Sequence, residues 1–486
     1  MGGSVIAHAG HPVVVVGAGV AGIAAAVSLS RAGVPVTLLE TRRKLGGRAT
    51  SFQDPRDGME LDNCQHVLMG CCTALLELYA ILGVSDAIEW HPTVWWANPP
   101  HEPDVMRPGW LPAPAHYTGS FLKMRMLGVA DKRAVARAML AMLRMGRRGR
   151  QSWAGRAFGD FLAQTRQTPV ALERFWEPVI ISACNGTCAE TDASYAMKVF
   201  QDGFLQDSWS PVMGLARLPL ARLYDPALAI IEGAGGCVRM GVSVQALAYD
   251  GSRISGVVTD EGLVDASAVI CALPPDRLER ICSETLRAAD ARLRSLGEMR
   301  HSPILGVHLF FDQPVMRTPH LVLPGRATQW LFSKGTDELG RHHVHAVISA
   351  AQEWMPLDEA EIAARVMRDV HWGIPSSVGI DPVAVRAVKE KRATFACVPG
   401  IDALRPSAAA DSIRGGVRNL LLAGDWCATG WPATMEGAAR SGFLAARAAI
   451  GCAPGVPAPE GAAESIPAIT DVPTAPLARM LGLRDA

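Results

Sequence analysis

The chain has 486 residues, of which 49% are hydrophobic and 19% charged, and its formal net charge at pH 7 is zero. That length is enough for two domains and a large core. A neutral chain lacks the basic surface that nucleic acid demands, so we expect no nucleic-acid partner. No window holds the roughly 18 unbroken apolar residues of a membrane-spanning helix.

The start of the chain and its cysteines indicate a cytoplasmic protein. The stretch MGGSVIAHAG lacks the charged and apolar regions of a secretory signal. The 11 cysteines are odd in number and irregularly spaced. We therefore expect free thiols in a reducing cytoplasm instead of disulfides.

Residues 12–40, PVVVVGAGVAGIAAAVSLSRAGVPVTLLE, contain the first motif. The run from Val13 to Val16 predicts a buried strand, and the run from Val36 to Leu39 predicts a second. Between them, apolar residues recur at the spacing of the core-facing side of a helix. Strand, glycine turn, helix, strand and closing acid, in that order, predict a doubly wound, Rossmann-like dinucleotide-binding domain.

The residues of this motif indicate its ligand. Gly17 allows the tight turn, Gly19 lets a diphosphate approach the backbone, and Gly22 lets the helix pack closely on the strand. Glu40 ends the second strand, where an acid accepts hydrogen bonds from an adenosine ribose and favours NAD or FAD over NADP. The predicted contacts of this turn also include Val20 and Ala21.

A second glycine pair follows in residues 40–50, ETRRKLGGRAT. Backbone amides beside paired glycines, together with a fixed cation, suit a second contact with a diphosphate. The residues predicted to make this contact are Thr41, Arg42, Gly46, Gly47 and Arg48.

Residues 62–72, DNCQHVLMGCC, gather acid, imidazole and thiol groups, which raises the question of a metal site. A structural zinc site needs four ligands, usually in two separated pairs. Cys71 and Cys72 are adjacent and cannot point the same way along regular structure, and no C-x-x-C pair follows. We therefore expect no metal and interpret the cysteines as small side chains of a pocket or core.

Residues 121–150 predict a basic amphipathic helix, with nine basic residues and one acid between Lys123 and Arg150. On a helix, four arginines fall within about 60° of one another, at 100° per residue. They are Arg133, Arg137, Arg144 and Arg148, and the side chains that face the other way are Val135, Met139 and Met142. Either the helix docks on an anionic bilayer, or its apolar stripe packs on the protein core and its arginines face water.

Strands are also predicted farther along the chain. Residues 229–273 read as successive strands around a DGSR turn, and ILGVHLFF at 304–311 and VHAVISA at 344–350 read as further strands. From Cys452 the chain is rich in Ala and Pro, so residues 452–486 are predicted to form a mobile tail.

Residues 419–447, NLLLAGDWCATGWPATMEGAARSGFLAAR, contain a closing motif. A strand from Leu420 to Ala423 is predicted to present Gly424 and Asp425 at its carboxyl end, where doubly wound folds bind ligands. A helix follows whose amino end can face an anionic or polar part of the ligand. Its first residues, Thr434, Met435 and Glu436, are predicted contacts.

These motifs resemble the flavin-containing amine oxidase and carotenoid desaturase superfamily, whose members bind FAD. Other stretches resemble one of its families more closely, that of hydroxysqualene dehydroxylase, also described as squalene-associated FAD-dependent desaturase. They are DNCQHVLMGCC, LPAPAHY with the basic helix, ERFWEPVIISACN, LPLARLYDPA, SPILGVHLFFD and TGWPATMEGAARSG. Together the matches extend from Val13 to Arg447.

The resemblance implies a Rossmann-like FAD-binding domain with an inserted α+β substrate domain. The FAD-binding domain comprises residues 11–53, 229–290 and 401–451, and the substrate and membrane-facing domain comprises residues 54–228 and 291–400. By the same resemblance, Val244 makes a backbone contact near the adenine. The residues expected beside the flavin ring are Asn63, Cys64, Gln65 and His66.

The resemblance further implies reduction of hydroxysqualene, a C30 isoprenoid alcohol, to squalene in bacterial hopanoid biosynthesis. Reduced FAD would deliver a hydride, and the departing hydroxyl would need a proton from Asp62, His66 or Glu436. The electron donor for FAD is left open, with NAD(P)H as one candidate. Because the substrate dissolves in lipid, we expect a peripheral position on the inner face of the cytoplasmic membrane.

Three alternatives stay open at this point. A carotenoid desaturase would take hydride from a polyene instead of delivering it. An amine oxidase would share the FAD motifs but need an aromatic cage for the amine, and nothing in the sequence singles one out. A non-enzymatic lipid carrier would have no need of a flavin.

Overall fold

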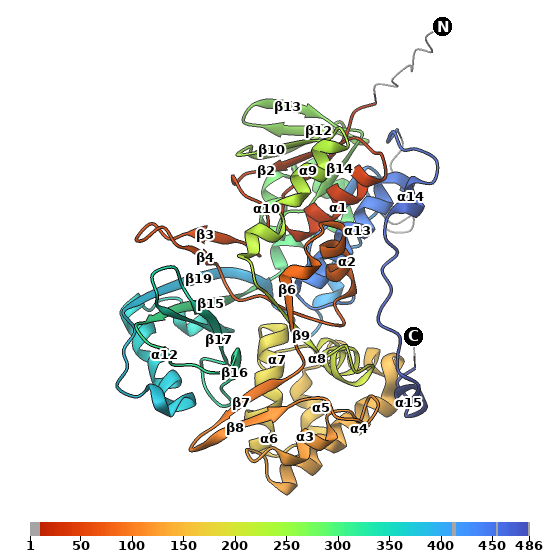
Figure 1. The fold of residues 1–486 in the computed structure, drawn as a ribbon. Helices are drawn as coiled ribbons and strands as arrows, with labels where there is room; N and C mark the ends of the chain where they lie inside the picture. The colour runs from red at the N-terminus through yellow and green to blue at the C-terminus, as the bar shows by residue number, and fades with distance from the viewer. Residues whose placement is uncertain (1–9, 411–414, 453–454, 485–486) are drawn as a thin grey trace.

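The computed structural model describes residues 10–410, 415–452 and 455–484. Figure 1 shows three regions: one built on a parallel sheet at the top, a second sheet covered by a helix at the lower left, and a group of helices at the bottom. Segments from both ends of the chain, red and blue in Figure 1, lie together in the upper region.

The upper region is built on a five-stranded parallel sheet. Its central strand pairs with a neighbour on each side along four residues and is buried on both faces, which requires the unbroken valine run. Each of the segments 11–53, 229–290 and 401–451 contributes strands to this sheet. In spatial order the strands are β10 (Cys237–Met240), β2 (Val36–Glu40), β1 (Val13–Val16), β14 (Ala268–Cys271) and β20 (Leu420–Leu422).

Helices α1 (Val20–Arg31) and α13 (Met435–Cys452) pack against each other in this region. A Cβ on Gly442 would lie 2.3 Å from the carbonyl oxygen of Ala21, so only glycine permits this close crossing. The first and last motifs of the chain are thereby joined by direct helix contact.

Helix α2 (Thr73–Ile81) also belongs to this upper region, which differs from our assignment of residues 54–228 to the substrate domain. It packs on α13, and its residues Ala74, Leu75 and Leu78 are fully buried in the core that α1 and α13 share. Helix α9 (Pro226–Gly233) packs on α1. The assignment is corrected at these two helices because their apolar faces complete the core of the dinucleotide-binding part.

Smaller sheets surround this core. Strands β11 (Val244–Tyr249), β12 (Ile254–Thr259) and β13 (Gly262–Asp265) form an antiparallel sheet of two hairpins. Strands β3 (Ser51–Gln53) and β4 (Glu60–Asp62) form a hairpin, and β9 (Met213–Ala216) pairs with both β5 (Val67–Met69) and β6 (Ile88–His91).

The lower region at the left contains a seven-stranded sheet covered on one face by α12 (Glu359–Gly373). In strand β15 (His301–Phe311), Leu305, Val307 and Leu309 pack with α12 in one core. Because side chains alternate along a strand, the even-numbered residues of β15 occupy the other face of the sheet. In spatial order the strands are β19 (Ala384–Phe395), β15 (His301–Phe311), β18 (His342–Ser349), β17 (Trp330–Thr336), β16 (His320–Val322), β7 (Val94–Asn98) and β8 (His101–Met106).

Helices between residues 118 and 205 form the third region, at the bottom of Figure 1. The aromatic rings of Phe158, Trp176 and Phe200 pack together in its core. The elements are α3 (Thr118–Lys123), α4 (Val129–Gln151), α5 (Phe158–Gln164), α6 (Pro169–Ala171), η2 (Leu172–Trp176), α7 (Glu177–Cys184), α8 (Ala193–Phe200) and η3 (Gln201–Leu205). Within the described ranges, no helix has both the length and the hydropathy to cross a membrane.

Helix α4 decides between the two interpretations of the basic stretch. Val135 and Met142 are buried in the main core, whereas Arg133, Arg144 and Arg148 are exposed. The apolar stripe is therefore occupied by the protein's own core and cannot be the surface that meets a bilayer.

The segment after α13 is packed, which corrects the prediction of a mobile tail over residues 452–486. Within residues 455–484, α14 (Ala462–Ser465) lies against α1 and α13, and α15 (Pro476–Met480) reaches the helices at the bottom. Ala478 and Leu483 are buried with Leu143 of α4. The prediction from Ala and Pro content was wrong because a few buried apolar side chains suffice to hold residues 455–484 against the rest of the protein.

Candidate active site

The glycine turn after β1 has the geometry of a ligand cradle. A Cβ on Gly22 would lie 1.9 Å from the carbonyl oxygen of Gly17, so glycine is required for α1 to start beside the strand. A Cβ on Gly19 would meet only the Cα of Gly47, at 3.9 Å, which leaves open space over that backbone. Gly17 itself has φ +100°, a conformation that favours glycine.

Glu40 lies at the carboxyl end of β2, beside this turn. Its carboxylate accepts hydrogen bonds from the backbone amides of Ala18 and Arg42, both at 2.8 Å. A carboxylate has about four acceptor sites, so ribose hydroxyls can still bind. The amide of Val242 donates to the Glu40 carbonyl oxygen at 3.0 Å, which brings the start of β11 and Val244 to the same edge.

The second glycine pair lies directly against the first turn. Gly46 donates its amide to the carbonyl of Ala18 at 2.9 Å, and Gly46 and Gly47 have φ of +98° and +62°. A Cβ on Gly47 would lie 2.9 Å from the Cα of Gly19. Two glycine turns from separate motifs thus form one backbone surface. Val20 and Ala21 are buried beneath it, Arg42 is exposed, and Thr41 is exposed beside it.

The closing motif is tied to this surface by an ion pair. The Arg48 guanidinium binds the Asp425 carboxylate at 2.5 Å and the Ala393 carbonyl at 2.8 Å. Gly424 donates its amide to the Ser441 hydroxyl at 2.7 Å, and Thr434 accepts from the amide of Gly437 in the first turn of α13. The prediction gave Arg48 a diphosphate contact, whereas its nearest anion among the described residues is Asp425.

Residues 62–66, hereafter segment 62–66, continue directly from β4 and face the sheet of the lower region. Asn63 donates to the Arg48 carbonyl at 2.7 Å, which joins the segment to the second glycine motif. Asp62 is buried and accepts from the Ser51 hydroxyl at 2.8 Å and the Leu220 amide at 2.9 Å. The Asp62 carboxylate therefore acts as an anchor of the segment.

Lys334 of β17 is a site residue that the sequence did not reveal. Its ammonium group lies 3.2 Å from the Asp62 carboxylate and 3.1 Å from the side-chain oxygen of Gln65. One cation thus holds both ends of segment 62–66. The only signal available in the sequence was the alternation of Trp330, Phe332 and Lys334, which places them on one face of a strand.

His66 keeps one ring nitrogen available. Its Nδ1 lies 3.0 Å from the Cys64 carbonyl, and because a carbonyl can only accept, Nδ1 carries the proton in the neutral ring. Nε2, for which the described residues provide no hydrogen-bond partner, then carries a proton only in the imidazolium form. Burial lowers the pKa of His66, although the Cys64 carbonyl opposes this shift.

Glu436, the third predicted proton donor, has a structural position instead. Its buried carboxylate accepts the amides of Ala74 and Leu75 at the start of α2, at 3.1 and 2.9 Å, and also binds Arg440. Burial raises the pKa of Glu436, against the opposing effect of Arg440. It caps α2, and its hydrogen bonds go to α2 and to Arg440 of α13. Met435, its neighbour, lies against the Tyr224 hydroxyl.

An apolar surface, hereafter the apolar wall, lies on the sheet opposite segment 62–66. It consists of Trp330, Phe332 and Val347, and Cys64 packs against the latter two. The rings of Trp330 and Phe332 stack with centroids 5.5 Å apart. Burial raises the pKa of the Cys64 thiol to about 12, so this cysteine serves as an apolar contact and not as a thiolate.

Three histidines continue the same sheet face beyond the apolar wall. His308 on β15 lies opposite His345 on β18, with ring centroids 3.9 Å apart, and its Nδ1 lies 2.9 Å from Nε2 of His343. Burial lowers the pKa of His308 to about 4 and that of His343 to about 2. These rings are neutral near pH 7 and fill the space beneath segment 62–66.

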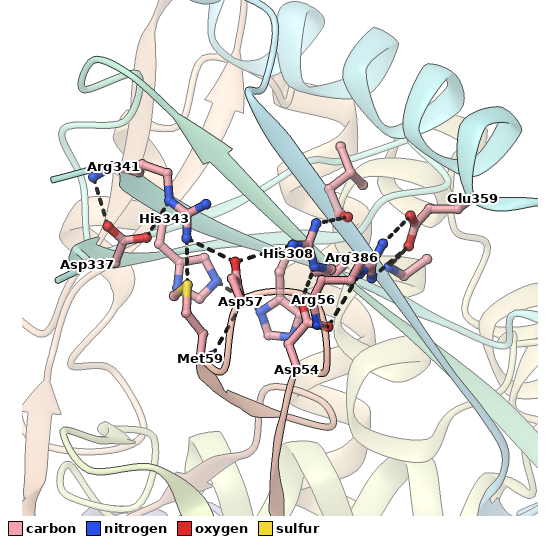
Figure 2. A network of polar contacts seen from close by, with 12 residues as sticks. Asp54, Arg56, Asp57, Met59, His308, Asp337, Arg341, His343, Glu359 and Arg386 are labelled. Atoms are coloured by element: carbon pink, nitrogen blue, oxygen red, sulfur yellow. Dashed lines mark hydrogen bonds and ion pairs between the residues drawn. The ribbon is translucent and has the colours of Figure 1, made fainter. Parts of the chain in front are cut away.

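A cluster of ion pairs clamps the β3–β4 hairpin onto this sheet, as Figure 2 shows. Arg386 of β19 binds the carboxylate of Asp54, whose side chain is 3% exposed. Arg56 binds Asp54 and also Glu359 at the start of α12, at 2.8 Å. Because β4 leads directly into segment 62–66, this clamp fixes the segment's distance from the apolar wall.

The cysteines and the candidate metal ligands can be located within the described ranges. The cysteines whose side chains the structure describes are all free. In the same described ranges, no three His, Cys, Asp or Glu side chains are grouped as metal ligands.

The geometry fits a dinucleotide that carries a flavin. The open backbone over Gly19, the acid at the end of β2 and the paired glycine turns suit the adenosine and diphosphate. Segment 62–66 lies beyond them, between the cradle and the apolar wall, where a ring system would follow. Fold and site therefore define an FAD-dependent oxidoreductase.

Comparison with known proteins gives the family. The chain belongs to the flavin-containing amine oxidoreductases, whose family model matches residues 20–450. It is 29% identical over 448 residues to the hydroxysqualene dehydroxylase of Sinorhizobium fredii, covering 90% of this chain and 97% of that protein. It is 26% identical over 462 residues to the 15-cis-phytoene desaturase of Solanum lycopersicum, covering 90% of this chain and 77% of that protein.

Solved structures agree on the fold. An oxidoreductase from Methanosarcina mazei superimposes with a TM-score of 0.69 at 18% identity, covering 90% of this chain and all of that one. The predictions of an FAD-binding, amine oxidase-like fold and of FAD as the cofactor are confirmed.

Proposed function

We propose that this chain reduces hydroxysqualene to squalene and releases water. Bound FAD, once reduced, supplies the hydride that replaces the hydroxyl on carbon. One carbon–oxygen bond breaks, one carbon–hydrogen bond forms, and a proton joins the leaving oxygen. A reductant such as NAD(P)H must then return two electrons, and its identity is open. The relatives named hydroxysqualene dehydroxylase, at 29% and 28% identity, support this choice.

The apolar wall is the observation that carries the proposal. Phe332 and Val347 are buried against Cys64, and the half-buried Trp330 extends this hydrocarbon lining at the edge of segment 62–66. An isoprenoid chain can lie on such a surface and exclude water from the reacting carbon, which protects both cationic character and hydride. An amine substrate would instead bring a positive charge, which this apolar surface does not compensate.

His66 is the group in the segment that suits proton transfer to the leaving oxygen. The oxygens of Asp62 and Glu436 are held by amides and cations, while Nε2 of His66 has no partner among the described residues. In the imidazolium form, Nε2 would donate a proton to the departing hydroxyl. Lys334 and the Cys64 carbonyl hold the segment and the ring in place for this role.

A pocket of about 300 Å³ lies next to the apolar wall along the chain and is the entry that we propose for the substrate. It lies between α7 and the loop before β17, and its lining combines Pro178, Ile181 and Gln329 with the charged residues Glu173, Glu177 and Arg326. Ser182 and Trp330, the next residues along the chain, are joined by a hydrogen bond of 2.6 Å. The pocket therefore lies close to Trp330 at the edge of the apolar wall.

A carotenoid desaturase is the second candidate, since relatives named phytoene desaturase share 26% identity over 90% of the chain. It would take hydride from its substrate and would have no leaving hydroxyl to protonate. Product analysis separates the two: reduced enzyme with hydroxysqualene should yield squalene, and oxidised enzyme with phytoene should yield nothing. Desaturation of phytoene without squalene formation would replace the proposal by this candidate.

A further inference from the structure

Large apolar side chains are exposed in the loop before α3, on α3 and at the start of α4, hereafter the tip. Helices α3 and α4 lie at the bottom of Figure 1. Trp110 is 91% exposed, Val129 is 65% exposed and Leu122 is 60% exposed. Exposing a tryptophan so fully is unfavourable in water unless the surface meets another phase or partner.

Hydrogen bonds tie together the chain segments that carry these three side chains. Trp110 lies in a loop closed by the Gly109 amide and the His116 carbonyl at 2.7 Å. The Ser120 hydroxyl of α3 donates to the Arg107 carbonyl at 2.8 Å, which fixes that loop to α3. The ammonium of Lys132, in the first turn of α4, donates to the Leu122 carbonyl at 2.8 Å.

The charge around this surface is strongly basic. Residues 107–137 contain six basic residues and a single acid, Asp131. Both carboxylate oxygens of Asp131 are engaged, by the Gly128 amide at 2.8 Å and the Thr168 hydroxyl at 2.6 Å. Arg107, Lys123 and Arg133 are exposed beside the apolar side chains. The tip thus combines apolar side chains with cations and little opposing charge.

We propose that this tip, comprising Trp110, Leu122, Val129 and the cations Arg107, Lys123 and Arg133, docks on an anionic lipid bilayer. Tryptophan and aliphatic side chains enter the boundary between headgroups and acyl chains, while lysine and arginine bind the headgroups. This assigns membrane contact to the tip and not to the apolar stripe of α4, which the core occupies.

The position of the tip suits delivery of a lipid substrate. Arg174 of η2 donates to the Met126 carbonyl beside the tip at 3.3 Å, and its neighbour Glu173 lines the pocket proposed as the substrate entry. Docking would place the pocket near the bilayer surface. This route rests on the proposed function, whereas docking itself depends only on the surface.

The first test measures flotation of the FAD-loaded full chain with vesicles of phosphatidylglycerol and phosphatidylcholine in equal parts. The triple variant Trp110→Ser, Leu122→Ser, Val129→Ser should bind about 30-fold or more weakly, because three apolar side chains no longer enter the lipid. The matched control Leu263→Ser, Leu339→Ser, Val378→Ser removes side chains that are 57%, 64% and 66% exposed elsewhere. It should bind like the parent.

The second test separates the tip from the rest of α4. Changing Arg107, Lys123 and Arg133 to Gln should weaken binding about fivefold per side chain. Changing Arg144 and Arg148 to Gln should have little effect, since they lie farther along the helix. Binding of the parent should also fall in 1 M salt, where the Debye length is about 3 Å.

Several results would overturn docking at the tip. Equal binding by the parent and the apolar triple variant would do so, as would a parent that stays off these vesicles. A parent that instead self-associates through Trp110 would make the tip a protein interface. With detergent-dispersed hydroxysqualene, which needs no membrane, the apolar triple variant should turn over substrate as fast as the parent. If the parent itself is inactive on this dispersed substrate, the result counts against the proposed function and not against docking.

Discussion

The glycine cradle and the apolar wall are built in different ways. The cradle comes from two short stretches, residues 17–22 and 40–48, whose backbone turns contact each other directly. The wall comes from β17 and β18, and segment 62–66 is held against it by contacts to residues far along the chain. The cradle therefore follows largely from local motifs, whereas the apolar wall depends on the tertiary fold.

The largest expected effect breaks the cradle at Gly22. In Gly22→Ala the new Cβ would lie 1.9 Å from the Gly17 carbonyl, a clash with backbone that α1 cannot relieve. We expect a loss of more than about 3 kcal/mol in the free energy of unfolding, measured by denaturation of the cofactor-free chain.

Gly19→Ala is the matched control, because its Cβ meets nothing closer than 3.9 Å. It should fold with nearly parental stability yet retain much less FAD. Equal stability losses at the two glycines would contradict the different roles assigned to them.

The clamp at the substrate side should give the next largest effect. Asp54→Ala leaves Arg386, whose side chain is 11% exposed, without its main partner, and should cost about 3 kcal/mol of unfolding free energy. Asp57→Ala removes longer contacts to Arg386, Arg341 and the Met59 amide, at 3.2, 3.4 and 3.3 Å, and should cost less than about 1 kcal/mol. Similar losses in urea denaturation of the two variants would argue against the clamp.

His66→Ala should slow turnover of hydroxysqualene by about 100-fold or more, with FAD binding and photoreduction unchanged. Because burial lowers the pKa of His66, the protonated form is scarce at pH 7, and turnover should rise as the pH falls below about 6.5. This rise should disappear in the variant. An unchanged rate and an unchanged pH profile would make His66 a bystander.

Glu40→Ala tests the cradle side again. It removes the carboxylate that accepts from the Ala18 amide and that we expect to accept from the ribose. Such bonds contribute about 1.5–3 kcal/mol, or roughly 10- to 150-fold in the dissociation constant of FAD. Fluorescence titration of the cofactor-free chain with FAD measures the change. Parental affinity in the variant would show that Glu40 does not contact the cofactor.

The smallest expected effect is the pH dependence of the stability that the Asp54 ion pairs contribute. Burial alone would raise the pKa of Asp54, but hydrogen bonds from Arg386 and Arg56 hold it below its ordinary value of 3.8. Because the pKa of Asp54 is lower in the folded than in the unfolded chain, its ionisation stabilises the fold fully above about pH 4. This stabilisation is lost as the pH falls from there through the folded-state pKa. The stability difference between parent and Asp54→Ala should therefore narrow below about pH 4. A constant difference would show that Asp54 is not ionised in the clamp.

Sequence patterns predicted the cofactor side well because its signals are local. The strands at 13–16 and 36–39, the glycines and the closing helix each follow from neighbouring residues. Lys334 and the Asp54–Arg386 pair were missed because each joins residues about 270 or 330 positions apart. Alternation in β18 places His343 and His345 on one strand face, but only the register with β15 shows that this face meets segment 62–66.

The anaerobic reaction of the reduced enzyme with hydroxysqualene tests the central claim most directly. We expect the flavin absorbance to return as substrate is added, with one squalene formed for each flavin oxidised. No reoxidation by hydroxysqualene, together with flavin reduction when phytoene is added to the oxidised enzyme, would contradict the account and reverse the direction of hydride transfer.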